Sequence, residues 1–129
     1  MVFRTVSSAR LLGFGLSLAL LAVPALAGQI NSNLQIEPAQ TFELGGGQEG
    51  GFVVTGRNTG AVAVVVLAQA PGGKPAVRGT VAPGGDVKAT FGPGEMALLR
   101  NTSAKETARL KLKISGDTSS LGMTYSANP

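Results

Sequence analysis

Three cationic side chains alternate with apolar ones in residues 107–115, and they carry the clearest chemical potential in the chain. Arg109, Lys111 and Lys113 occupy every second position there. Cations held in a row on one surface attract carboxylates, sulfates or phosphates. The segment therefore predicts either a surface for an acidic ligand or, more simply, a solvated face whose charges keep a sheet soluble.

Two further cations have outward parity on neighbouring segments and could widen this surface. The candidate binding surface then comprises Arg78, Lys88, Arg109, Lys111 and Lys113. Its expected partners are an anionic glycan, a lipid headgroup or an acidic patch on a protein. A nucleic acid is not expected, because no aromatic side chains are interleaved with the cations to stack on bases.

The chain contains few of the residue types and motifs that enzymes use for catalysis. The chain has no His and no Cys, which removes the commonest general base, the thiol nucleophile and the usual ligands of zinc and copper. A Ser103–Lys105 pair lacks any motif for an oxyanion hole, and most carboxylates fall in turns. The glycine-rich run 45–51 is not followed by the Lys-Ser/Thr pair of a phosphate-binding loop. We expect no enzyme, catalytic residue, cofactor or metal site.

The element that positions the cations is best interpreted as a β-strand. Strict alternation places Ala108, Leu110, Leu112 and Ile114 on the face opposite the cations. A helix is the alternative, since Ser103 and Glu106 have capping-box spacing. In a helix, Leu110 and Leu112 would lie about 200° apart around the axis and could not share one apolar face. The pattern therefore favours a strand.

The first 27 residues predict a cleaved secretory signal peptide. Arg4 and Arg10 precede an apolar run from residue 11 to residue 23, and Ala25-Leu26-Ala27 is a small-x-small cleavage site. The run is short for a membrane anchor. We therefore expect an exported protein, periplasmic or extracellular, with no membrane span after cleavage.

Residues 28–129 are expected to form a single domain. Removing Arg4 and Arg10 leaves nine Lys and Arg against seven Asp and Glu, so the high isoelectric point overstates the charge of the processed chain. Without cysteine, this exported domain must be stabilised by its core rather than by disulfides.

The pattern of short apolar segments and turns predicts an all-β fold. About eight strands of mainly antiparallel pairing are separated by Pro, Gly, Asn and Asp turns, which is typical of a β-sandwich of immunoglobulin-like proportions or, alternatively, a β-barrel. We expect residues 28–33 to be a flexible lead-in. Two short strands follow around Pro38, the apolar segment 61–68 is central, and Val77 and Val81 face inward in segment 76–82.

The tripeptide Arg-Asn-Thr occurs twice, at residues 57–59 and 100–102, each time between two strands. Because Asn and Thr side chains bond to nearby backbone, the repeat predicts the same turn structure used twice, once in each sheet, rather than a duplicated ligand site. Asn101-Thr102-Ser103 also matches the acceptor pattern for N-glycosylation.

These observations predict a non-catalytic binding or structural protein that acts through protein–protein contact. A carbohydrate-binding module, for anionic glycans in particular, is the alternative. An inhibitor or surface-assembly subunit that adds a strand to a partner is the third hypothesis.

Overall fold

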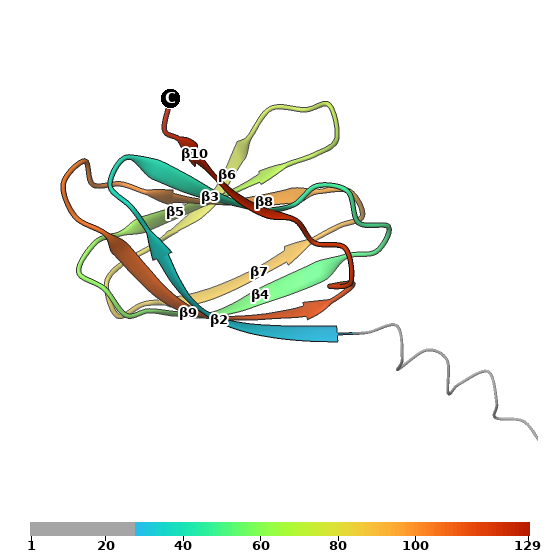
Figure 1. Ribbon diagram of the computed structural model, residues 1–129, viewed down its shortest axis with the longest axis horizontal. Coiled ribbons are helices and arrows are strands. Elements are labelled where there is room, and N and C mark those ends of the chain that lie inside the picture. Colours follow the sequence, from blue (N-terminus) through green and yellow to red (C-terminus); the bar gives the residue numbers. More distant parts are fainter. Residues whose placement is uncertain (1–27) are drawn as a thin grey trace, which may run out of the picture.

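Residues 28–129, the part of the chain that this computed structural model describes, form nine β-strands in two antiparallel sheets (Figure 1). The predicted signal peptide, residues 1–27, lies outside the described residues. The strands are β2 (Gly28–Ile36), β3 (Gln40–Gly45), β4 (Phe52–Asn58), β5 (Val64–Gln69), β6 (Ala76–Val81), β7 (Asp86–Phe91), β8 (Met96–Asn101), β9 (Ala108–Gly116) and β10 (Met123–Ala127).

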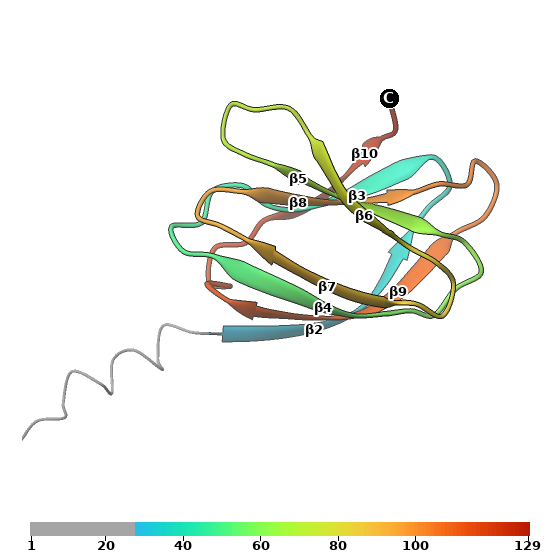
Figure 2. The ribbon, with the colours of Figure 1, turned by 180° about the vertical axis from the view of Figure 1, so that it is seen from behind.

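The two sheets are stacked as a sandwich, which confirms the all-β prediction. One sheet has the order β10-β3-β8-β5-β6 and the other the order β2-β9-β4-β7. Neither sheet closes on itself, so the barrel alternative is wrong. Figure 2, the view from behind, shows the same two layers with β6 and β7 on the near side.

The core lies between the inner faces of the two sheets. Phe52 and Phe91 stack with ring centroids 5.1 Å apart, and Leu44, Leu99, Leu110 and Ile114 are almost completely buried around them. Burying an aliphatic or aromatic side chain of this size contributes about 1.5–3 kcal/mol each, which is how a cysteine-free domain of this length is stabilised.

β9 follows its sequence pattern closely. Ala108, Leu110, Leu112 and Ile114 are buried and the cations between them are exposed. β9 lies between β2 and β4, so this strand carries much of the inner face of its sheet. The strand prediction for residues 107–115 is confirmed.

The prediction of a flexible lead-in at residues 28–33 is wrong. These residues are the first two thirds of β2, a nine-residue strand paired with β9 from Gly28–Gly116 to Ile36–Ala108. The strand is long although most of residues 28–33 are polar, because β9 supplies an equally long ladder of backbone partners.

Val77 also departs from the prediction, since its side chain is 66% exposed while Val81 is buried. The register between β5 and β6 shifts between Val66 and Leu67, where Val66 pairs with Gly79 and Leu67 pairs with Val77. The extra residue, Arg78, forms a bulge, and a bulge exchanges the faces of the residues beyond it. Val77 is thereby turned to the outer face.

Each open side of the sandwich is closed by one long polar side chain. On one side the Tyr125 hydroxyl of β10 donates to the Gln35 carbonyl of β2 at 3.0 Å, and its ring packs on Phe42. On the other side Arg78 Nη1 of β6 donates to the Thr90 carbonyl of β7 at 2.9 Å. These contacts join edge strands of different sheets.

Candidate functional site

The outer face of the four-stranded sheet gathers the polar and cationic side chains of four strands. Alternation along each strand sends its apolar residues to the core and the others outward. The outward residues are Gln29, Asn31, Asn33 and Gln35 on β2, Arg109, Lys111, Lys113 and Ser115 on β9, Val53, Thr55 and Arg57 on β4, and Asp86, Lys88 and Thr90 on β7. We call this surface the basic face.

The register arranges the basic face in rows that cross the strands. One row runs Asn31–Lys113–Thr55–Lys88, and the next runs Asn33–Lys111–Arg57–Asp86. Residues opposite each other on antiparallel strands have Cα atoms about 4.5–5.5 Å apart. Each of these two β9 lysines therefore has an amide side chain on one side and a β4 side chain on the other.

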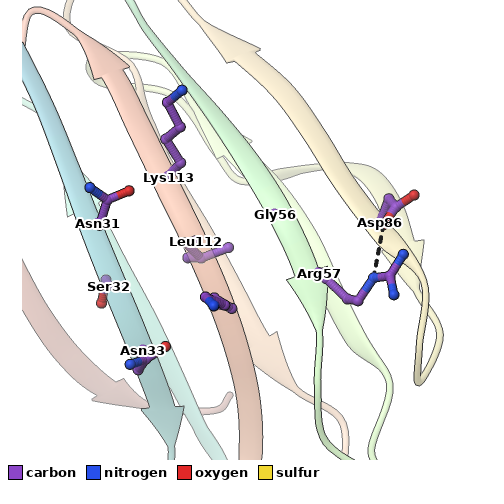
Figure 3. A pocket seen from close by; sticks show the side chains of 9 residues that line it. Asn31, Ser32, Asn33, Gly56, Arg57, Asp86, Leu112 and Lys113 are labelled. Carbon is purple, nitrogen blue, oxygen red and sulfur yellow. Dashed lines mark hydrogen bonds and ion pairs between the residues drawn. The ribbon is translucent and has the colours of Figure 1, made fainter.

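The middle of the basic face is a shallow hollow of about 520 Å³ (Figure 3). Asn31, Asn33, Lys113, Arg57 and Asp86 border it, with Gly56 in the β4 backbone. Figure 3 shows the two asparagines on β2 and the Arg57–Asp86 pair on the opposite side. The amide, cationic and carboxylate side chains around this open hollow offer hydrogen-bonding and charged groups to a ligand.

Gly56 allows β4 and β9 to approach each other closely beneath this hollow. Its φ is +155°, and a Cβ atom at this position would collide with the Lys111 carbonyl oxygen and meet Leu112 Cα at 3.0 Å. Glycine is the residue that tolerates such a close approach of two backbones. The local geometry of the hollow therefore depends on this residue.

Charge is strongly segregated onto the basic face. Five of the nine Lys and Arg in residues 28–129, and one of the seven carboxylates, lie there. The single carboxylate, Asp86, accepts a hydrogen bond from Arg57 Nε at 3.3 Å, and both side chains are well exposed. An exposed pair of this kind contributes at most about 1 kcal/mol, so both groups can turn toward a ligand.

Four of the five predicted site residues come together. Arg109, Lys111 and Lys113 lie along β9, and Lys88 on β7 ends the Lys113 row; all four are exposed. Arg78 does not join them. It belongs to the other sheet, donates to the Thr90 carbonyl and Glu95, and lies 5.1 Å from the centroid of the Phe91 ring.

Sequence reasoning missed two parts of the basic face. Arg57 had outward parity but was not grouped with the other cations. The predicted lead-in at residues 28–33 excludes Gln29, Asn31 and Asn33 from the surface, although these amides alternate with other residues at every second position. This alternation of amides is the sequence pattern that indicates a strand with one polar face.

Four backbone N–H groups of the glycine-rich run 45–51 are already hydrogen-bonded within the domain, two of them to a side chain of the run itself. Gln48 is buried, and its Oε1 accepts hydrogen bonds from the N–H groups of Gly46 and Gly47 at 2.8 and 3.2 Å. Its Nε2 donates to the Glu95 carbonyl at 2.8 Å. The loop is thereby fastened to the turn between β7 and β8.

Asn101, the residue of the glycosylation pattern, is completely buried. Its Nδ2 donates to the carbonyl oxygens of Ile36, Glu37 and Glu106 at 2.7–3.2 Å. A glycan could not be attached to this side chain in the folded domain without breaking those bonds.

Within residues 28–129, no three Asp or Glu side chains gather as a metal-binding group, and no helix is long and apolar enough to cross a membrane. Comparison with known proteins adds no relative: no family model, no curated protein and no solved structure matches the chain. The basic face is therefore the candidate site on the strength of its own geometry.

Proposed function

We propose that this protein is an exported, non-catalytic binding protein whose basic face takes an acidic polysaccharide. Export follows from the pattern of residues 1–27. The observation that carries the ligand class is the segregation of five cations beside a ladder of amides on one sheet face. Cations attract carboxylate or sulfate groups, and amides donate to and accept from sugar hydroxyls.

The composition of the basic face favours a polysaccharide over a protein. Protein interfaces are enriched in aromatic residues and depleted of lysine. The outward positions of β2, β4, β7 and β9 hold three lysines and no aromatic residue. The protein–protein contact predicted from the sequence would therefore need a different surface.

The periodicity of the basic face suits a polymer. Successive outward residues of one strand are about 6.6–6.8 Å apart, so β9 presents its three cations as a regular row. A linear polyanion lying along β9 would meet a cation at each step and an amide beside it. A small anion would use only one of these positions.

Titration calorimetry with polygalacturonate and heparin, at low salt, tests this function. We expect both polyanions to bind and neutral dextran not to bind. The double variant Lys111→Gln/Lys113→Gln should weaken binding about tenfold, because each surface cation contributes up to about 1 kcal/mol. Added salt should weaken binding of the unmodified protein, since exposed charges are screened.

The matched control is Lys74→Gln/Lys105→Gln, which removes two exposed lysines from loops outside the basic face. This control should bind like the unmodified protein. Absence of polyanion binding, or an equal loss of affinity in both double variants, would contradict the proposal.

A further inference from the structure

Among residues 28–129, β2 is an edge strand, and its free side carries backbone N–H and C=O groups that bond to no other strand. The Thr59 N–H donates to the Arg109 carbonyl at 3.0 Å, so the backbone of Arg109 points toward β4 and away from β2. Gln35, opposite Arg109, therefore points its own backbone outward, where Tyr125 reaches its carbonyl. By alternation, Gln29, Asn31 and Asn33 also present N–H and C=O groups to the free side.

The other three edges are blunted. β6 contains the bulge at Arg78, and β10 has only five residues. β7 carries the charged Asp86 and Lys88, and its Thr90 carbonyl accepts a hydrogen bond from Arg78. Charges, bulges and short length are the usual protection against unwanted pairing. β2 has nine residues, no charge, no proline and a continuous register. Among the described strands, β2 is therefore the edge with the least protection against pairing.

The sequence of β2 is palindromic in residue type. Residues 29–35 read Gln-Ile-Asn-Ser-Asn-Leu-Gln, and the pattern is the same in both directions about Ser32. In an antiparallel pair of two such strands centred on Ser32, Gln29 faces Gln35, Asn31 faces Asn33 and Ile30 faces Leu34. Each side chain then lies opposite one of the same type, with amides on the outer face and aliphatic groups on the inner face.

We propose that β2 pairs antiparallel with β2 of a second copy of this chain, about a two-fold axis through Ser32. The outward backbone groups of the four amide residues from both copies would form about eight hydrogen bonds. The Gln35 carbonyl can keep Tyr125, since a carbonyl oxygen accepts two bonds. A two-fold interface is self-complementary and closes on itself, so the product is a dimer rather than a filament.

The dimer has one continuous eight-stranded sheet with both basic faces on the same side. β9 and its partner copy lie three strand spacings apart, about 14 Å, with the amides of both β2 strands between them. This separation exceeds the distance over which exposed charges interact strongly at physiological salt. The two basic faces therefore do not oppose pairing, and pairing needs no ligand on either face.

Sedimentation velocity over a concentration series, on protein expressed from the whole sequence, gives the first test. We expect a monomer–dimer equilibrium that Asn31→Pro weakens at least tenfold. Proline removes an N–H that points to the free side and leaves the β2–β9 ladder bonded. Asn31→Thr, which keeps the N–H and suits a strand, should dimerise like the unmodified protein.

Cross-linking gives a second test that does not depend on a proline variant folding. The chain contains no cysteine, and Ser32 would face its symmetry mate with Cβ atoms about 4.5–5.5 Å apart, close enough for a disulfide after a small adjustment. Ser32→Cys should oxidise to a covalent dimer, whereas Thr80→Cys on the exposed edge strand β6 should not.

Three results would overturn the proposal. They are a protein that stays monomeric throughout the series, a dimer that Asn31→Pro retains while folded, and equal oxidation of Ser32→Cys and Thr80→Cys. If Asn31→Pro lowers the melting temperature, the cross-linking comparison decides the question by itself.

Discussion

At the scale of single residues, the two buried asparagines have nearly identical roles. Asn58 Oδ1 accepts the Gly60 N–H at 3.0 Å, and Asn101 Oδ1 accepts the Ser103 N–H at 2.8 Å. The amide nitrogens then donate to carbonyls of the following loop and of a distant segment. The predicted turn structure is confirmed, with Asn58 in one sheet and Asn101 in the other.

Asn101→Ala is expected to lower the free energy of unfolding by about 3 kcal/mol, because it removes the four hydrogen bonds of a buried side chain, each contributing about 0.5–1.5 kcal/mol. Urea unfolding followed by circular dichroism measures the change. Asn33→Ala, at an exposed amide, is the control and should stay within about 0.5 kcal/mol. A similar loss in both variants would contradict the role assigned to Asn101.

At the scale of elements, β9 positions both the core and the site. Its buried leucines face the opposite sheet while its cations face solvent. A substitution on one face should therefore affect folding, and a substitution on the other should affect only the surface.

Leu112→Asp is expected to unfold the domain or lower its melting temperature severely, since an unpaired carboxylate would be buried in the core. Lys111→Glu should melt close to the unmodified protein. Thermal unfolding of the two variants side by side makes the comparison. If the two behaved alike, the alternation of β9 would be assigned to the wrong faces.

Strands in which apolar residues alternate could be predicted from the sequence. Strands that form because a neighbouring strand pairs with them could not. β9 and β4 carry alternating hydrophobic residues that specify a face without reference to neighbours. The first residues of β2 include Ile30 alone, and they are extended because β9 pairs with them. Val77 faces outward, against the prediction, because a one-residue bulge at Arg78 exchanges inward and outward positions in β6. The local sequence contains no signal that predicts this bulge.

At the scale of the whole molecule, the candidate site depends on long-range strand order. β9 lies between β2 and β4 in space, although β2 and β9 are some seventy residues apart in the chain. Alternation along the strands alone predicts that Lys88 and Arg78 share one surface, because it carries no information on strand order. The topology places Lys88 on the basic face and Arg78 at the seam between the sheets, where it closes the sandwich against Thr90 and Phe91.

Pairing through β2 would make polymer length matter for binding. In the dimer, two basic faces lie on one sheet, and a long polyanion can engage the second face at high effective concentration, which commonly adds a factor of about 100 or more to affinity. A short galacturonate oligomer that covers one face gains nothing. We expect long polygalacturonate to bind the unmodified protein far more tightly than the oligomer does.

Comparing Asn31→Pro with Asn31→Thr isolates this effect, because both variants lack the Asn31 amide and keep the cations of β9, but only the proline should abolish pairing. Calorimetry should then give the same affinity for the oligomer in both variants and a lower affinity for the long polymer in Asn31→Pro. Long polymers should also promote dimerisation of the unmodified protein, since a ligand that prefers the dimer must stabilise it. A ratio of long to short affinities equal in Asn31→Pro and Asn31→Thr would mean that the two faces act separately, even if each binds a polyanion.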